Sequence, residues 1–137
     1  MTTLSMIDAA PRAFVPEAIT DEEAGALFRA ALNLFQRWEI SDSQAAILLD
    51  LPPRTFARWK AGSVSRIGKD GKARLSNLMG IHKALRYLFQ EPARGYAWIK
   101  RPNDAFAGQS ALDVMLGGEL TDLMRVRRYL DAERGAW

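Results

Sequence analysis

Residues 41–62, SDSQAAILLDLPPRTFARWKAG, decide the fold that we expect for this chain. The stretch opens with a capping box at Ser41 and Gln44 and continues as a short apolar helix. It breaks at Pro52 and Pro53, because each proline excludes its predecessor from helical backbone angles. Pro53 also suits the first position of a second helix, which we expect to end before Gly62. Two short helices joined by a tight turn predict a helix-turn-helix that reads DNA.

The second of these helices, over residues 54–60, has two unlike faces on a helical wheel. Phe56 and Trp59 fall together and are expected to anchor the helix. Arg54 and Arg58 point outward, one turn apart, where arginine can make bidentate contacts with guanine in the major groove. The alternative is that these arginines form an ordinary solvated helix face, in which case the helix-turn-helix shape is retained without DNA binding.

Charge along the chain is segregated, although the net charge of the 137 residues is only +3. Residues 54–74 hold seven cations against one anion, Asp70. A local basic patch of this kind attracts the phosphate backbone of nucleic acids. In the loop that we expect over residues 62–73, cations would contact phosphates without reading sequence. The residues that we expect at the DNA are Arg54, Thr55, Ala57, Arg58, Lys60, Arg66, Lys69 and Lys72.

Further helices are predicted on both sides of this stretch, and the fold class is all-α because no period-2 run of β-branched residues occurs. Residues 1–19 are expected to form a loose arm, and residues 62–73 a loop or a small hairpin wing. The expected helices cover residues 20–38 after a capping box at Thr20, 74–90, a short segment from Pro92, 110–116 capped by Ser110, and 119–133.

The sequence offers no catalytic or metal site, so we expect neither an enzyme nor a cofactor. The one histidine, His82, lies on the inward stripe of the helix over residues 74–90 and is expected to be a hydrogen-bonded core residue. The aromatic stripe Phe28, Phe35 and Trp38 is either core or a surface for self-association, and core is the simpler interpretation.

Cellular location follows from what the chain lacks. Without cysteine it has no disulfides, which suits the reducing cytoplasm. No apolar run approaches the roughly 18–20 residues of a membrane span. We therefore expect a cytoplasmic protein with no membrane contact.

Residues 98–119, WIKRPNDAFAGQSALDVMLGGE, resemble the toxin-binding domain of the Xre/MbcA/ParS antitoxin family. That family's pattern runs roughly W-[LI]-x-x-P-N-x-x-L-x-G-x-x-P-L-D-x-L-x-x-G-E. Phe106 replaces the usual leucine, and Ala111 replaces the usual proline, so that Ser110 is expected to cap the next helix alone. The matching positions are Trp98, Pro102, Asn103, Gly108, Leu112, Asp113, Gly118 and Glu119.

The resemblance covers about residues 20–137 and implies two domains: an Xre-like helix-turn-helix domain over 20–90 and a small helical toxin-binding domain over 91–137. It implies as partner a RES-domain toxin, which consumes NAD or uses it for ADP-ribosylation. The antitoxin would occlude the toxin's active site with its last helix and tail. The residues expected at the toxin are Trp98, Pro102, Asn103, Phe106, Gly108, Arg125, Arg128, Arg134 and Trp137.

Aromatic and arginine side chains dominate interface energies, so the arginines of the last helix and Trp137 are suited to occlude an active site. The plain alternative is that Trp137 is a frayed terminus and that the arginines keep the helix soluble.

The leading hypothesis is therefore a cytoplasmic antitoxin that forms a hetero-oligomer with its toxin. As a homodimer it would bind a roughly palindromic operator and repress its own operon. One rival is a stand-alone helix-turn-helix transcriptional regulator without a toxin. Another is a protein-interaction module whose helix-turn-helix no longer binds DNA.

Overall fold

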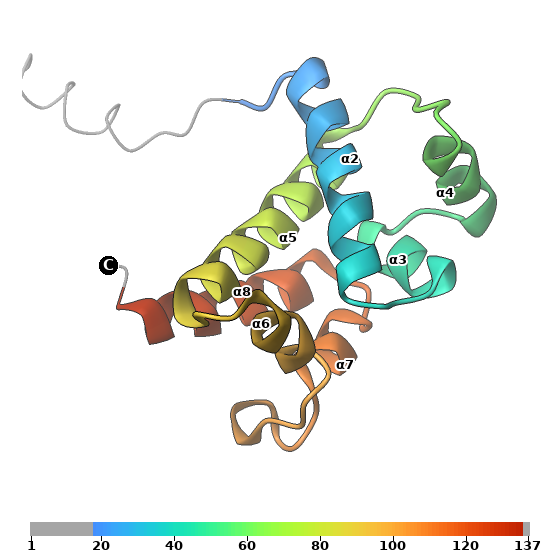
Figure 1. The fold of residues 1–137 in the computed structure, drawn as a ribbon. Coiled ribbons are helices and arrows are strands. Elements are labelled where there is room, and N and C mark those ends of the chain that lie inside the picture. Colours follow the sequence, from blue (N-terminus) through green and yellow to red (C-terminus); the bar gives the residue numbers. More distant parts are fainter. Residues whose placement is uncertain (1–17, 136–137) are drawn as a thin grey trace, which may run out of the picture.

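The computed structural model describes residues 18–135, which fold into seven α-helices and one short 3-10 helix (Figure 1). Within this range the backbone forms no strand, only an isolated bridge between Pro102 and Ser110. The all-α prediction is confirmed, while the expected arm falls almost wholly outside the described residues. The helices are α2 (Asp21–Arg37), α3 (Asp42–Leu49), α4 (Pro53–Lys60), α5 (Lys69–Leu88), α6 (Pro92–Trp98), η1 (Asp104–Phe106), α7 (Ala111–Met115) and α8 (Leu120–Arg134).

Capping boxes begin the helices where the sequence predicts them. Before α2, Thr20 Oγ1 accepts a hydrogen bond from the Glu23 amide at 3.1 Å, and Glu23 Oε1 accepts from the Thr20 amide at 2.9 Å. Ser41 and Gln44 make the same exchange before α3. Before α7 the partner of Ser110 is Asp113, whose carboxylate accepts from the Ser110 amide. The expectation that Ser110 caps its helix alone is therefore wrong, because Asp113 completes the capping box.

Helix α5 begins at Lys69 rather than near Arg74, so the prediction of a loop or hairpin wing reaching residue 73 is wrong. Asp70 and Gly71 look like a turn signal in the sequence, but both are helical. A Cβ atom on Gly71 would lie 2.9 Å from Cγ2 of Ile67, which is buried, so this glycine makes room for a core side chain. Asp70 stands in the first turn, where its charge suits the helix dipole.

Helix α5 is the centre of the molecule, since it packs against α2, α6 and α8. Helices α5 and α8 run side by side in the same direction (Figure 1). Three arginines join them from beginning to end: Arg74 donates to the Gly118 carbonyl just before α8, Arg127 lies over Gly80, and Arg134 lies over the ring of Tyr87. The helix-turn-helix and the C-terminal region consequently share one helix.

The aromatic stripe of α2 lies in the core. Phe28 and Trp38 are each 1% exposed and Phe35 is 4% exposed, which leaves no free aromatic face for self-association. His82 is half-buried on α5 and lies parallel to the ring of Tyr96 from α6, with the ring centroids 6.1 Å apart. Its buried Nδ1 has no hydrogen-bond partner among the described residues, so the expected hydrogen bond is absent at this atom.

Two further observations apply to the described residues. None of its helices has both the length and the apolar character to cross a bilayer. Nowhere in residues 18–135 do three or more His, Asp or Glu side chains gather as metal ligands would.

Candidate DNA-reading helix and toxin-binding surface

The turn between α3 and α4 is made by backbone geometry that the sequence supplies. Asp50 adopts left-handed angles, with φ of 52° and ψ of 47°, and ends α3. Pro53 occupies the first turn of α4, where the missing amide hydrogen costs nothing. The turn redirects the chain sharply, and α4 stands at the edge of the molecule (Figure 1).

Helix α4 is anchored by two aromatic side chains that pack against α2. Phe28 meets Phe56 edge-on at a centroid distance of 6.3 Å and meets Trp59 at 5.5 Å. The indole Nε1 of Trp59 also donates to Ser65 Oγ at 3.0 Å, which holds the loop after α4. With this face buried, the opposite face of α4 must point to solvent.

The residues on that outer face are the ones predicted to read DNA. Arg54, Ala57 and Arg58 are exposed, and Thr55 is half-buried. Arg54 and Arg58 are one helical turn apart with the small Ala57 between them, so no bulky side chain separates them. The geometry of a recognition helix is thus present on α4.

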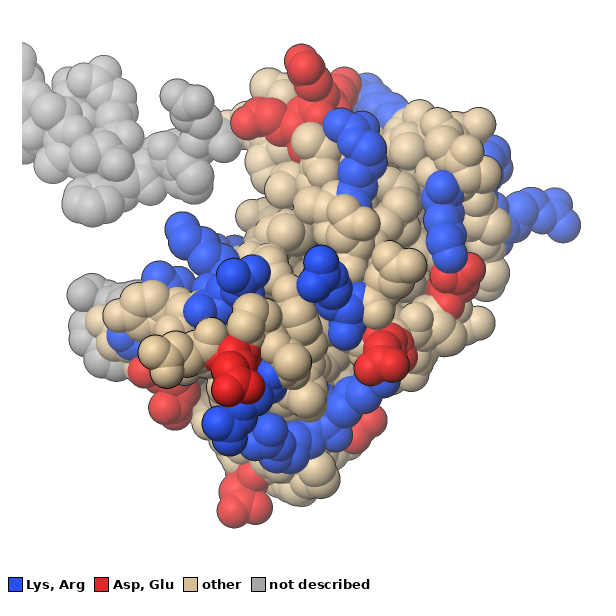
Figure 2. Space-filling model, viewed as in Figure 1, with Lys and Arg blue, Asp and Glu red and all other residues tan. Residues whose placement is uncertain are grey.

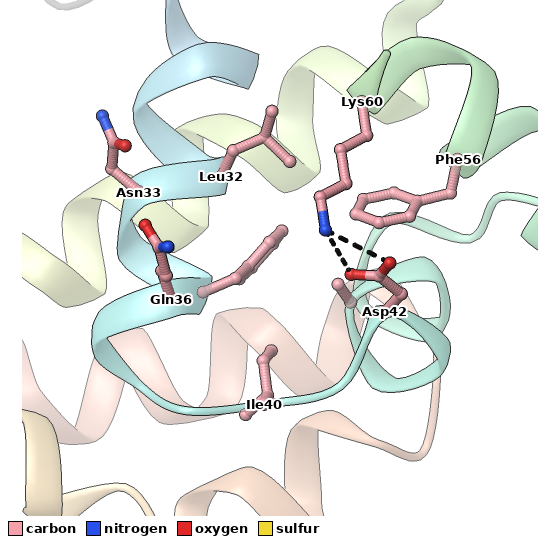
Figure 3. A pocket seen from close by; sticks show the side chains of 9 residues that line it. Leu32, Asn33, Gln36, Ile40, Asp42, Phe56 and Lys60 are labelled. Atoms are coloured by element: carbon pink, nitrogen blue, oxygen red, sulfur yellow. Dashed lines mark hydrogen bonds and ion pairs between the residues drawn. The ribbon is translucent and has the colours of Figure 1, made fainter.

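Lys60 lies apart from this face. Its Nζ donates to both carboxylate oxygens of Asp42, at 2.9 and 3.2 Å, across a shallow pocket of about 180 Å³ between α2, α3 and α4 (Figure 3). Apolar side chains, among them Leu32, Ile40 and Phe56, line most of this pocket. The ion pair joins the two helices of the helix-turn-helix.

The three cations predicted to contact phosphates from a loop have different settings. Arg66 is exposed in the loop between α4 and α5, whereas Lys69 and Lys72 belong to α5. Nζ of Lys72 lies 3.0 Å from Oδ1 of Asp21, and this hydrogen-bonded cation holds the pKa of Asp21 below its usual value. Lys72 therefore ties the beginnings of α2 and α5 together.

Acidic and basic side chains gather over different helices on the surface. Figure 2 shows acidic side chains over the beginning of α2 at the top of the view, and cations projecting at the right-hand edge over α4. Of the seven cations in residues 54–74, Arg74 is buried and Lys60 and Lys72 are paired with acids. Arg54, Arg58, Arg66 and Lys69 make no ion pair within the described range, and they remain as the exposed basic set.

In the C-terminal region an aromatic cluster joins α6, η1 and α8. Trp98 stacks on Tyr129 with centroids 6.1 Å apart and planes 7° from parallel, and Phe106 meets Tyr129 at 5.2 Å. The guanidinium carbon of Arg125 lies 5.3 Å from the centre of the Phe106 ring. Phe106 itself is only 2% exposed. Arg125, Trp98 and Tyr129 are therefore the members of this cluster that a partner can reach.

The loop between α6 and α7 owes its shape to the Pro-Asn and Gly positions of the motif. Asn103 Oδ1 accepts from the Ala105 amide at 2.9 Å and so begins η1. The Asn103 carbonyl accepts from the amide of Gly108, whose φ is +87°. A side chain would be strained at that angle, which explains the glycine. Asn103 and Gly108 thus hold the loop in shape, while Pro102 is exposed on it.

The predicted arginines of α8 divide into two kinds. Arg125 and Arg128 are exposed, whereas the side chain of Arg134 is 22% exposed. Arg134 lies 3.8 Å from a carboxylate oxygen of Asp131, and its guanidinium carbon is 4.9 Å from the centre of the Tyr87 ring. The remaining predicted contact, Trp137, lies outside the described residues.

Two residues that matter here are not evident from the sequence. Arg74 belongs to the basic stretch of residues 54–74, yet it is 3% exposed and joins three segments of the chain. Tyr87 is 67% exposed at the end of α5. Its position off the apolar stripe of a helical wheel is a signal that could have identified it.

Two family models match successive parts of the chain. Residues 17–80 match the Antitoxin Xre-like helix-turn-helix domain, and residues 84–135 match the Antitoxin Xre/MbcA/ParS C-terminal toxin-binding domain. A curated relative, the uncharacterized protein y4oB of Sinorhizobium fredii (strain NBRC 101917 / NGR234), is 46% identical over 114 residues. That alignment covers 82% of this chain and 84% of the relative.

Among solved structures, a chain of the M. tuberculosis MbcT-MbcA toxin-antitoxin complex has a similar fold, with a TM-score of 0.51 and 23% identity. The match covers 77% of this chain and 91% of that chain. At this identity the likeness concerns the fold alone. The sequence matches over both halves show that this chain belongs to the Xre/MbcA/ParS family of antitoxins.

Proposed function

We propose that this protein is the antitoxin of a RES-domain toxin that degrades NAD or transfers its ADP-ribose. In this proposal the C-terminal region binds the toxin and occludes its active site. The helix-turn-helix binds operator DNA as a homodimer and represses the operon, alone or in a toxin–antitoxin hetero-oligomer. The protein acts in the cytoplasm and catalyses no reaction of its own.

The observation that carries the toxin-binding part is the surface formed by α6, η1 and α8. It combines reachable aromatic side chains, Trp98 and Tyr129, with the exposed Arg125 and Arg128. Aromatic residues and arginine are the commonest energetic anchors of protein interfaces. The similarly folded chain from M. tuberculosis comes from a toxin–antitoxin complex, MbcT-MbcA, which supports the same role for this chain.

The DNA-binding part is supported by α4. Its buried face is fixed by Phe56 and Trp59, so Arg54 and Arg58 are presented outward on a rigid support. A single short helix contacts only a few base pairs, and specific operators are therefore read by dimers with matching half-sites.

Co-expression with the protein encoded by the neighbouring gene tests the proposal. We expect that protein to carry a RES-type signature, to arrest growth when expressed alone, and to co-purify with this chain in a harmless complex. A neighbour that is harmless alone and does not co-purify would refute the antitoxin role.

The second candidate function is a stand-alone transcriptional regulator, which the exposed arginines of α4 equally allow. In that case the protein binds its promoter DNA with no change when the neighbouring gene is deleted. An interaction module without DNA binding would instead show no promoter binding under any condition. Promoter-binding assays with and without the neighbouring protein therefore distinguish the antitoxin, the stand-alone regulator and the interaction module.

A further inference from the structure

The end of α5 carries the most exposed large hydrophobic side chain of the described residues, and the motif over residues 98–119 does not include it. Tyr87 is 67% exposed, compared with 43% for Ile47 and 38% for Val64. An aromatic ring left in water on a rigid helix forgoes the gain from burial, which makes it a candidate anchor for a partner.

The ring of Tyr87 is held in place from one side. The guanidinium carbon of Arg134 lies 4.9 Å from the ring centre, and Arg134 is steadied by Asp131 at 3.8 Å. A ring that is already fixed loses little side-chain freedom when a partner covers it. The pair therefore presents a pre-organised aromatic and cationic surface.

The position of this pair within the family match identifies its partner. Tyr87 and Arg134 both lie within residues 84–135, which match the antitoxin C-terminal toxin-binding domain. Because α5 and α8 run in parallel, their last turns lie together (Figure 1). A toxin that binds α8 near Arg134 therefore also comes close to Tyr87.

We propose that Tyr87, supported by Arg134, is a toxin contact that extends the interface from α8 onto the end of α5. The partner surface belongs to the cognate toxin. The C-terminal halves of α5 and α8 carry the exposed cations Lys83, Arg86 and Arg128 against one exposed anion, Glu133, so that the facing surface of the toxin is expected to be acidic. This inference rests on the proposed antitoxin function.

The test measures binding of the purified chain to a catalytically inactivated variant of the neighbouring gene's protein by calorimetry. Tyr87→Ala should raise the Kd at least ten-fold, as loss of an interface anchor does. Tyr87→Phe keeps the ring and should stay within about three-fold of the unchanged chain, a margin of less than 1 kcal/mol. Ile47→Ala is the matched control, since it removes an exposed apolar side chain from α3 and should leave the Kd unchanged.

Thermal unfolding and sedimentation complete the test. Because Tyr87 is mostly exposed, Tyr87→Ala should unfold at the temperature of the unchanged chain and sediment as the same species. A Kd within three-fold of the unchanged chain would overturn the inference while leaving the antitoxin function standing. A change in self-association would also overturn it, since the surface would then face a second copy. If the unchanged chain binds no toxin at all, the proposed function fails instead.

Discussion

The guanidinium of Arg74 donates a hydrogen bond of 2.8 Å to the carbonyl oxygen of Gly118, 44 residues further along the chain. The same Nη1 lies 3.3 Å from the Leu48 carbonyl at the end of α3, and Nε donates to Asp70 at 2.8 Å. One buried side chain thus joins the first helix of the helix-turn-helix to the segment that precedes α8. Backbone carbonyls at such places need a partner when they are buried.

Replacing Arg74 by methionine should lower the free energy of unfolding by about 2–4 kcal/mol, because two carbonyl groups lose their charged donor. Urea denaturation followed by tryptophan fluorescence measures the change. Asp70→Asn is the control: its side chain is 56% exposed, and loss of such an ion pair should cost less than about 1 kcal/mol. Equal losses in the two variants would contradict the central role of Arg74.

Replacing Arg54 or Arg58 by alanine should weaken binding to the promoter DNA of its own gene by about 1–3 kcal/mol each, the usual worth of a bidentate contact. Fluorescence anisotropy at one fixed salt concentration measures the affinity. Lys60→Ala tests which face of α4 meets the DNA, since Lys60 is engaged with Asp42 on another side of the helix. An equal loss for Lys60→Ala would mean that the helix meets DNA through a different face.

Replacing Arg128 by alanine should weaken toxin binding without lowering stability, because this side chain is exposed on α8. Phe106→Ala should behave differently. Its buried ring supports Tyr129, and its loss should cost about 3–5 kcal/mol of stability. Calorimetry with the toxin and thermal unfolding of each variant separate the two effects. An Arg128→Ala variant that is folded and binds normally would exclude this face of α8 from the interface.

Acidification should destabilise the protein through His82. Burial, followed by the neighbouring Arg86 and Arg37, lowers the pKa of His82 below its usual 6.5. Below pH 6.5 the unfolded chain therefore takes up a proton that the folded protein still refuses, and the free energy of unfolding falls as the pH drops. The fall cannot exceed about 1.4 kcal/mol per pH unit for one proton.

The difference in the free energy of unfolding between the unchanged chain and His82→Gln separates the effect of His82 from that of the carboxylates, which titrate in both proteins. That difference should be constant well above pH 6.5, where His82 is neutral in the folded and the unfolded chain, and should shift in favour of the variant as the pH falls from 6.5 to about 5. A difference that does not vary with pH would show that His82 titrates alike in the folded and unfolded chain.

The helices of the helix-turn-helix domain were predictable because short-range sequence signals mark where they begin and end. The exchange between Thr20 and Glu23, the one between Ser41 and Gln44, and the break at Pro53 depend on residues close together in the chain, and each is found as predicted. The sequence does not reveal that α5 begins at Lys69, because Asp70 and Gly71 resemble a turn. Gly71 is instead required by the packing of Ile67. That contact exists only once the core is assembled.

In the candidate DNA-binding and toxin-binding surfaces, too, features within one helix were predictable and contacts between helices were not. The two faces of α4 followed from a helical wheel, since Phe56, Trp59, Arg54 and Arg58 keep the sides that it assigns them. The pairing of Lys60 with Asp42 and of Lys72 with Asp21 joins separate helices, so no single-helix pattern could reveal it. The link from Arg74 to Gly118 spans the whole fold and was unpredictable for the same reason.

The position of α5 between the two halves bears on how such antitoxins can be recombined. The two sequence matches meet at residues 80–84, in the second half of this helix. A chimaera spliced there would set a foreign α8 against a half-native α5 and would break the register of the arginines that bridge the pair. Swapping toxin specificity between relatives therefore requires that the exchanged fragment begin before Lys69, so that α5 travels with α8.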